Sequence, residues 1–183
     1  MLTQTNRSSS NKNLKHSLLA GAFLLLVIVG AKIDLDFGRL VSFTLQTLFL
    51  GLAYYFLPPR WRLGLIITYL LLGIVGVPVF NGGVGWSYFS SWPFGFFAGF
   101  ILAALMKPSG KKSFLFVLLY FIQVHMVIVL AGTVWMAFYI GNIPDALSTA
   151  LDLQAGVIIK SLVGAAIVWT ILKYTTLISD KSH

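Results

Sequence analysis

The chain has 183 residues, of which 58% are hydrophobic, 15% aromatic and only 10% charged, with a mean hydropathy of +0.89. This balance excludes an ordinary soluble domain and is typical of a polytopic membrane protein. The absence of cysteine excludes a disulfide framework, a thiolate metal site and a cysteine nucleophile. The formal net charge of +8 suggests nucleic acid, but the positions of the basic residues argue against that partner.

Six hydrophobic segments are mostly long enough to cross a bilayer, which takes about 20 residues per helix. The sequence therefore predicts an all-α membrane protein with six transmembrane helices, over residues 17–31, 40–57, 63–80, 88–106, 113–140 and 153–172. Residues 14–177 form the predicted membrane domain. The polar residues 1–13 predict a disordered cytoplasmic tail and residues 178–183 a second one. The first segment lacks an Ala-x-Ala-like cleavage site, so we expect it to be retained.

The basic residues gather on one side of these predicted helices. Ten of the thirteen lie in loops on that side, at Arg7, Lys12, Lys15, Arg60, Arg62, Lys107, Lys111, Lys112, Lys173 and Lys181. The other side combines basic and acidic residues, at Lys32, Asp34, Asp36, Arg39, Asp145 and Asp152. By the positive-inside rule, this arrangement predicts a multi-pass protein of the cell membrane with both termini in the cytoplasm.

The first two segments carry two patterns of interest. Small residues gather in the first segment, at Ser17, Ala20, Gly21 and Ala22, and predict either a docking face for a partner helix or close internal packing. Thr44, Gln46 and Thr47 lie near the outer end of the second segment. Gln46 can both donate and accept hydrogen bonds, so it could read an amide or ureido group, with bonding between helices as the alternative.

A turn rich in proline and glycine, without any charged residue, joins the third and fourth segments. Irregular backbone at membrane depth is tolerated only where it is buried in protein or lines a cavity. Pro78, Gly82, Gly83 and Gly85 therefore predict a re-entrant loop or a pocket floor, with a tight external turn as the alternative. The aromatic cluster that follows predicts an interfacial belt, of which one or two residues could wall a pocket. Its members are Trp86, Tyr88, Trp92, Phe94, Phe96 and Phe97.

Two ionisable residues stand inside predicted helices. Lys160 has apolar neighbours and is predicted to contact an anionic ligand, with snorkelling to the outer interface as the alternative. His125 lacks the spacing of a zinc helix and the chain contains no Glu, so we expect His125 to pack in the core, without metal, cofactor or catalysis. Gly110 and Lys111 lack the rest of a phosphate-binding loop, so energy from ATP would have to come through a partner.

Three segments together resemble the BioY family, the membrane-embedded biotin-binding components of energy-coupling-factor transporters. They are VGAKI with FTLQTLFLGL, LLGIVGVPVFNGGVGW, and IPDALSTALDLQAGVIIKSLVGAA. Lys160 matches the family's lysine in the last helix, and Gly82, Gly83 and Gly85 match its loop glycines. The acidic residue expected three positions before the lysine is Val157.

The resemblance implies an S-component-like bundle of six helices with a Gly-rich outer loop between the third and fourth. It also implies capture of biotin from outside, by a subunit that works with a coupling membrane protein and two ATPases or acts alone. Docking would use the small residues of the first helix, Ser17, Ala20, Gly21 and Ala22. The expected ligand contacts are Thr44, Gln46, Phe80, Asn81, Gly82, Gly83, Gly85 and Lys160.

In this prediction, residues 80–85 form a lid or floor and Lys160 neutralises charge on a carboxylate vitamin. Biotin is the leading ligand, and lipoate or dethiobiotin are alternatives. Two other classes of function are weighed against uptake. One is an intramembrane enzyme that uses Lys160 and His125. The other is a helix-packing assembly factor without a ligand.

Overall fold

The structure is a computed structural model that describes the backbone of residues 2–35 and 43–180, and the side chains of residues 10–33 and 44–175. Several expectations fall on residues outside these ranges. They are the side-chain charges at Arg7, Asp34, Asp36, Arg39 and Lys181, the start of the second predicted helix at Leu40, and the outer parts of the two predicted tails, residue 1 and residues 181–183.

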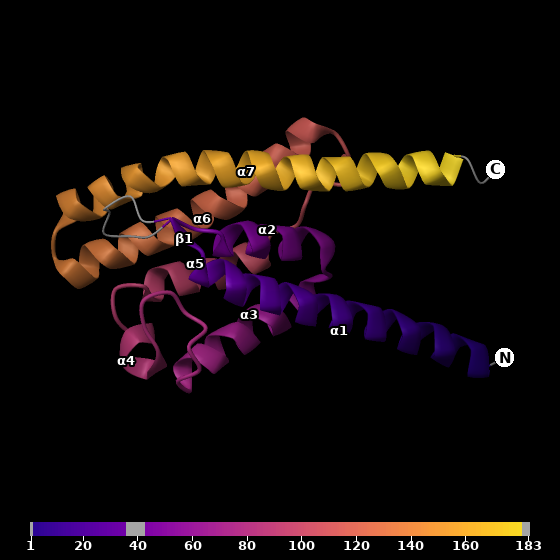
Figure 1. Cartoon of the computed structure of the whole chain (residues 1–183), viewed down its shortest axis with the longest axis horizontal. Helices are drawn as coiled ribbons and strands as arrows, with labels where there is room; N and C mark the ends of the chain where they lie inside the picture. Colours follow the sequence, from indigo (N-terminus) through magenta and orange to yellow (C-terminus); the bar gives the residue numbers. More distant parts are fainter. Residues whose placement is uncertain (1, 36–42, 181–183) are drawn as a thin grey trace.

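Within the described residues, seven helices and one pair of two-residue strands follow one another along the chain (Figure 1). They are α1 (Leu2–Lys32), β1 (Asp34–Leu35), β2 (Phe43–Thr44), α2 (Gln46–Phe56), α3 (Pro59–Ile74), α4 (Gly85–Phe89), α5 (Phe94–Ala104), α6 (Phe114–Ile140) and α7 (Ile143–Asp180). The strands pair antiparallel, with Asp34 opposite Thr44 and Leu35 opposite Phe43. Both chain ends lie at one end of the molecule, and α4 and the strand pair lie toward the other (Figure 1).

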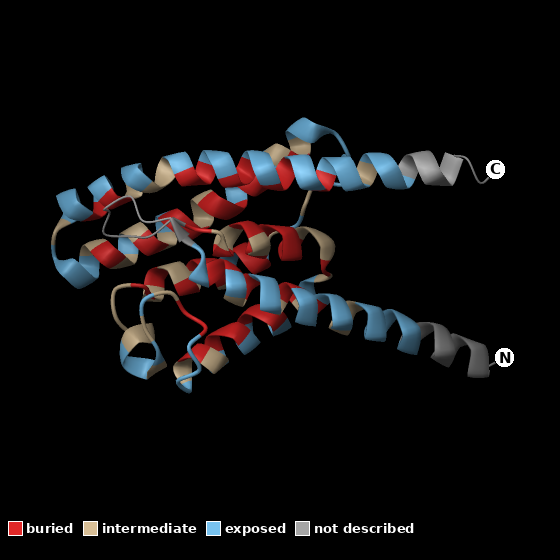
Figure 2. Cartoon of the chain, in the orientation of Figure 1, coloured by how far each residue is buried: buried red, intermediate tan, exposed pale blue. Residues whose placement is uncertain are grey.

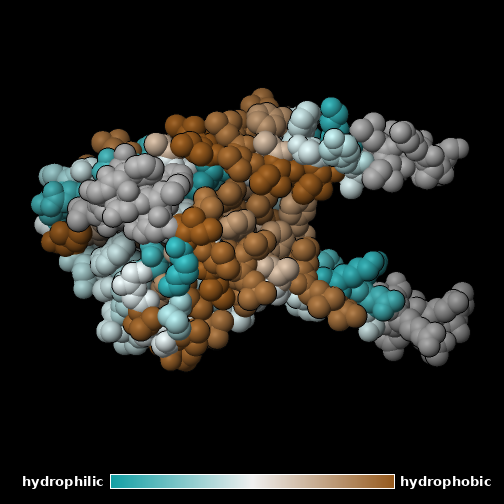
Figure 3. All heavy atoms as spheres, viewed as in Figure 1, coloured by the Kyte–Doolittle hydropathy of each residue, from teal (hydrophilic) through white to brown (hydrophobic). Residues whose placement is uncertain are grey.

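Three helices of the described chain are long and apolar enough to cross a membrane, within Ser10–Lys32, Phe114–Ile140 and Ile143–Thr175. Figure 3 shows hydrophobic residues as a broad band across the middle of the molecule, with hydrophilic residues toward both ends. This distribution matches a protein embedded in a bilayer, whose apolar core is about 30 Å thick. The expected all-helical membrane protein is thus confirmed, while α2, α3 and α5, of 11, 16 and 11 residues, are shorter than a full crossing requires.

Proline and glycine end several helices earlier than predicted. Helix α3 stops at Ile74 rather than residue 80, because Gly76 takes a positive φ of 98° and Pro78 disfavours helical backbone in the residue before it. The single helix predicted over 88–106 is wrong. It is divided into α4 and α5, and Pro93 is the residue from which α5 starts. Its ring disfavours helical backbone at Trp92, which favours a break between the two helices.

The last helix begins ten residues before the predicted position, at Ile143 instead of 153. Asn142 provides the local reason, because its Oδ1 accepts a hydrogen bond from the backbone N–H of Asp145 at 3.2 Å and so satisfies a free donor of the first turn. Pro144 is also tolerated in a first turn, where its missing N–H has no helical partner to lose. At the other end of the chain, α1 begins at Leu2, within the stretch for which the sequence predicts a disordered tail. The division into tails and membrane domain stays a prediction.

The core lies among α1, α2, α3, α5, α6 and α7, and Figure 2 shows the buried residues concentrated on their facing sides. Helix α6 packs against both α5 and α7, while α1 packs against α2 and α3. Arg62, predicted to lie in a cytoplasmic loop at the interface, is instead 4% exposed. Its Nε donates to the carbonyl of Leu57 at 2.6 Å, and its guanidinium also donates to the carbonyl of Met106. Arg62 therefore joins the end of α2 to the end of α5.

Candidate functional site

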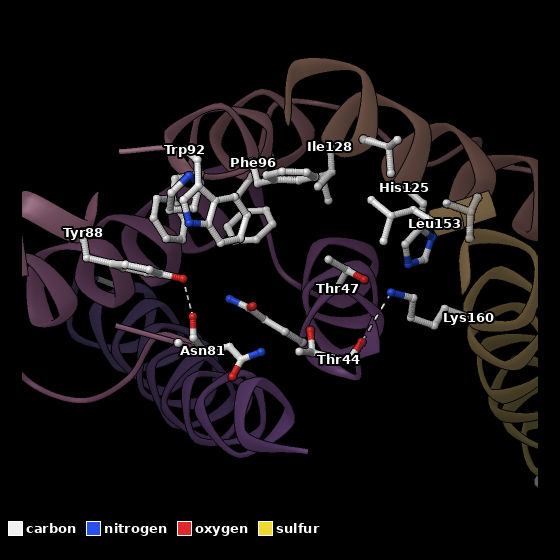
Figure 4. A pocket seen from close by; sticks show the side chains of 17 residues that line it. Thr44, Thr47, Asn81, Tyr88, Trp92, Phe96, His125, Ile128, Leu153 and Lys160 are labelled. Atoms are coloured by element: carbon white, nitrogen blue, oxygen red, sulfur yellow. Dashed lines mark hydrogen bonds between the residues drawn. The ribbon is translucent and has the colours of Figure 1, made fainter. Parts of the chain in front are cut away.

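A cavity of about 370 Å³ lies between β2, α2, α4, α5, α6, α7 and the loop that follows α3 (Figure 4). Its volume falls in the range of roughly 300–1,000 Å³ that is usual for small-molecule sites. The residues that line it are Thr44, Gln46, Thr47, Asn81, Gly82, Tyr88, Trp92, Pro93, Phe96, Phe97, Phe100, His125, Ile128, Val129, Leu153, Val157 and Lys160. Elements far apart in the sequence thus meet around one space.

One side of the cavity is aromatic. Tyr88 and Trp92 pack edge to face with their ring centroids 6.3 Å apart, and Trp92 packs in the same way on Phe96 at 6.4 Å. The break between α4 and α5 makes this arrangement possible, because it lets Tyr88 approach from a separate short helix. Such a wall offers ring faces to an apolar heterocycle.

The opposite side is polar, and Figure 4 shows His125 and Lys160 there with Thr47 beside them. Lys160 is 9% exposed, and its Nζ donates to the carbonyl oxygen of Thr44 at 3.3 Å. His125 is 2% exposed, with its Nδ1 2.8 Å from the carbonyl oxygen of Phe121 and 3.1 Å from Oγ of Ser161. This side can therefore present a cation and an imidazole to one ligand.

A chain of hydrogen bonds ties the cavity to the loop after α3. Gln46 Nε2 donates to the hydroxyl of Tyr69 at 2.7 Å, and that hydroxyl donates to the carbonyl of Val79 at 3.0 Å. Lys32 Nζ donates to the carbonyl of Phe80, so α1 also holds this loop. One of the two amide N–H groups of Gln46 is thus used to position the loop.

The loop itself is packed closely against α4. The Tyr88 hydroxyl donates to the carbonyl of Asn81. A Cβ added at Gly83 would lie 2.2 Å from Cδ2 of Tyr88, so only glycine allows the backbone to pass this close to the ring. Asn81 and Gly82 line the cavity as a result.

The structure brings five of the eight predicted ligand contacts to the cavity: Thr44, Gln46, Asn81, Gly82 and Lys160. Phe80, Gly83 and Gly85 do not line it. Phe80 is 1% exposed and packs its ring against Tyr69 and Phe97, while Gly83 faces Tyr88 and Gly85 begins α4. Their direct role in binding stays a prediction.

Several lining residues were not among the predicted contacts. His125 was expected to pack in the core, and Thr47 was noted without a role, yet both reach the cavity. His125 follows Phe121 by four positions and Thr47 directly follows Gln46. Neither spacing distinguishes a residue that lines a cavity from one that packs between helices. Of the aromatic cluster, Tyr88, Trp92, Phe96 and Phe97 line the cavity, whereas Trp86 is 65% exposed.

The predicted docking residues of α1 do not share one environment. Ala20 is buried, Ser17 is half-buried with its Oγ bonded to the carbonyl of Leu14, and Gly21 and Ala22 are exposed. Only part of this patch is therefore open to another helix, and its docking role stays a prediction.

Comparison with known proteins shows the family of this chain. The model of the BioY family matches residues 4–177. The chain belongs to the BioY family. The biotin transporter BioY of Thermotoga maritima is 33% identical over 139 residues, which cover 74% of this chain and 82% of that relative. The probable biotin transporter BioY of Pyrococcus horikoshii is 32% identical over 128 residues, covering 69% and 77%.

The fold of this BioY family member is also found in a solved structure. A crystal structure of the S-component for biotin from an ECF-type ABC transporter superposes with a TM-score of 0.76. The two chains are 19% identical, and the match covers 89% of this chain and 93% of the other. The likeness shows an S-component fold, as the BioY resemblance predicts.

Proposed function

We propose that this chain is the membrane-embedded subunit that binds biotin for uptake from the outside. The observation that carries the proposal is the cavity of about 370 Å³, which sets an aromatic wall against a buried Lys160 in a member of the BioY family. Two relatives named biotin transporter or probable biotin transporter, each similar over more than two thirds of this chain, support the same function.

The chemistry of the lining suits biotin. The thioether ring and the valeryl chain are apolar and fit against Trp92 and Phe96, since aromatic faces are good lining for such groups. The carboxylate or the ureido oxygen fits the Lys160 ammonium, and the ureido group fits the amide of Asn81. Dethiobiotin and lipoate share part of this chemistry and are the related ligands to compare.

We propose six membrane crossings, with α2, α3 and α5 completing their passages through irregular backbone. The loop from residue 75 to residue 84 and the turn before Pro93 both border the cavity or the core, which is where non-helical backbone is tolerated in a membrane. An even number of crossings is supported by the two termini lying at the same end of the molecule (Figure 1). The positive-inside rule then puts both termini in the cytoplasm and the Gly-rich loop outside.

Transport energy would come from a partner ATPase module, or the chain would act alone. A coupling membrane protein would dock on the exposed part of α1 around Gly21 and Ala22, where small side chains allow close approach. Catalysis by His125 and Lys160 is the competing use of the cavity, because both residues line it. No carboxylate of the described residues lines the cavity, so no acidic group stands among the lining residues to complement His125 and Lys160 in acid–base catalysis.

Calorimetric titration of the purified protein in detergent tests the proposal, first with biotin and then with dethiobiotin and lipoate. We expect nanomolar to low-micromolar affinity for biotin and no turnover of the vitamin. A folded protein that binds none of the three would refute a vitamin-binding function. Preference for lipoate or dethiobiotin would reassign the ligand within the same class.

A further inference from the structure

Two polar atoms on the polar side of the cavity have no hydrogen-bond partner among the described residues. They are Nε2 of His125 and Oγ1 of Thr47, and both are buried from solvent. Both residues line the cavity, and Figure 4 shows them near the ammonium group of Lys160. Buried polar groups in native proteins are nearly always paired, so an unpaired atom that faces a cavity marks a place where a ligand supplies the partner.

The hydrogen bonds of the other ring nitrogen define what His125 can offer. The carbonyl oxygen of Phe121 only accepts, so Nδ1 at 2.8 Å from it carries the proton. The neutral ring then has an unprotonated Nε2, which is an acceptor. A second proton would place another positive charge beside Lys160 in a buried site, which both desolvation and repulsion oppose.

The ring is held in this orientation by two neighbouring groups. The carbonyl of Phe121 lies on the same helix one turn earlier, and Oγ of Ser161 comes from α7, where the residue is fully buried. Ser161 directly follows Lys160 in the chain, so a single turn of α7 places both the ammonium group and the support for the imidazole. The ring is therefore held in one orientation, and Figure 4 shows it turned toward the ammonium group of Lys160.

We propose that His125 is a specificity-determining residue of the biotin site, whose Nε2 accepts a hydrogen bond from a ligand N–H, with the Thr47 hydroxyl as a second contact. This inference rests on the proposed biotin-binding function and adds a residue to it. A donor at Lys160 beside an acceptor at His125 is complementary to a group that carries C=O and N–H side by side. A ureido group has this pattern, whereas a carboxylate would meet the lone pair of Nε2 with its own.

The arrangement discriminates between vitamins of similar shape. Biotin and dethiobiotin carry ureido N–H groups, and lipoate carries none. A ligand without an N–H would leave Nε2 buried and unpaired, and sites built to hydrogen-bond a substrate N–H reject analogues that lack it. Val157 also lines the cavity, and its side chain offers no acceptor that could replace Nε2 of His125.

The test is calorimetric titration with biotin and with two analogues, each methylated on one of the two ureido nitrogens. We expect His125→Leu to weaken biotin binding about tenfold, as for loss of a hydrogen bond in a buried site. We expect His125→Gln to recover most of the affinity, because its amide oxygen can accept near the position of Nε2. At the nitrogen that pairs with His125, methylation should weaken binding to the wild type strongly and to His125→Leu only slightly.

His16→Leu is the matched control, because His16 also has a buried unpaired ring nitrogen but lies beside Trp61, outside the cavity. Its biotin affinity should equal that of the wild type. The inference about His125 would be overturned, with the proposed function still standing, by either of two results. One is a biotin affinity of His125→Leu within twofold of the wild type. The other is an equal loss of affinity in both proteins when the ureido nitrogen is methylated. A folded wild-type protein that binds no biotin would overturn the proposed function together with it.

A measurement on the wild type guards against a variant that does not fold. Nitrogen NMR of protein labelled in its histidines should show the Nε2 signal of His125 moving when biotin is added, with the signals of His16 unchanged. A His125 signal that does not respond to saturating biotin would contradict the proposal.

Discussion

Replacing Lys160 by Met separates the binding role of this residue from any structural role. The two side chains have similar length, so the substitution removes the ammonium group while keeping most of the packing. A hydrogen bond to a charged group contributes about 1.5–3 kcal/mol. Its loss corresponds to a fall in biotin affinity of roughly 10- to 150-fold.

Stability should not fall in the same variant. A charged side chain at the centre of a membrane helix costs about 2.5–3.5 kcal/mol on insertion scales. Lys160 is 9% exposed, and the 3.3 Å bond from its Nζ to the Thr44 carbonyl offsets only part of such a cost. We therefore expect Lys160→Met to unfold at the same or a higher temperature than the wild type while it binds biotin far more weakly.

Calorimetric titration in detergent measures the affinity, and tryptophan fluorescence during heating measures the unfolding. Lys173→Met is the control, because Lys173 lies on the same helix with its Nζ 5.2 Å from the centroid of the Trp169 ring, outside the cavity. Its affinity should match the wild type. Unchanged biotin affinity in Lys160→Met would refute the assignment of this lysine to the ligand, and a large loss of thermal stability would show a structural role.

Three further substitutions test the scaffold around the cavity. Arg62→Leu leaves two backbone carbonyls without their charged donor and should lower the free energy of unfolding by about 2–3 kcal/mol, measured by thermal or denaturant unfolding. Arg62→Lys should recover part of this loss. A stability of Arg62→Leu equal to that of the wild type would contradict this account. Tyr69→Phe removes two hydrogen bonds and should lower the free energy of unfolding by about 1–2 kcal/mol and also weaken biotin binding. Unchanged stability and unchanged biotin affinity would argue against the hydrogen-bonded connection between Gln46 and the loop after α3. Gly83→Ala places a methyl group against Tyr88, an overpacking that costs about 1–3 kcal/mol. Weaker biotin binding is therefore expected by calorimetry, and Gly110→Ala, which has open space around it, should bind normally.

Much of the fold could be predicted from local features of the sequence. Hydrophobic segments indicated a helical membrane protein because burial in lipid demands apolar side chains over a full crossing. Pro78, Gly82, Gly83 and Gly85 indicated either irregular backbone near a pocket or a tight external turn, because proline disfavours helical backbone in the residue before it and glycine adopts a positive φ at little cost. Lys160 stood out because a buried charge in an apolar helix is costly and needs a reason.

Helix ends were less well predicted where short-range chemistry competes with hydropathy. Asn142 and Asp145 are polar, and hydropathy therefore placed the start of the last helix too late, although their capping hydrogen bond begins it. Trp92 and Phe94 are apolar, and hydropathy therefore joined α4 to α5 across Pro93. Hydropathy measures the preference for lipid, whereas helix ends depend on backbone hydrogen bonds.

The sequence by itself determined the membrane class and the family and singled out Lys160 as a candidate ligand contact, since each depends on composition or on residues close together in the chain. Only the tertiary structure decided that His125 and Thr47 face the same cavity as Lys160 and that Phe80 does not. Thr44 and Lys160 are 116 positions apart, yet they share a hydrogen bond. In a membrane helix the side facing lipid and the side facing the core are both apolar, so periodicity does not reveal which side chains meet. That choice is made by packing between helices.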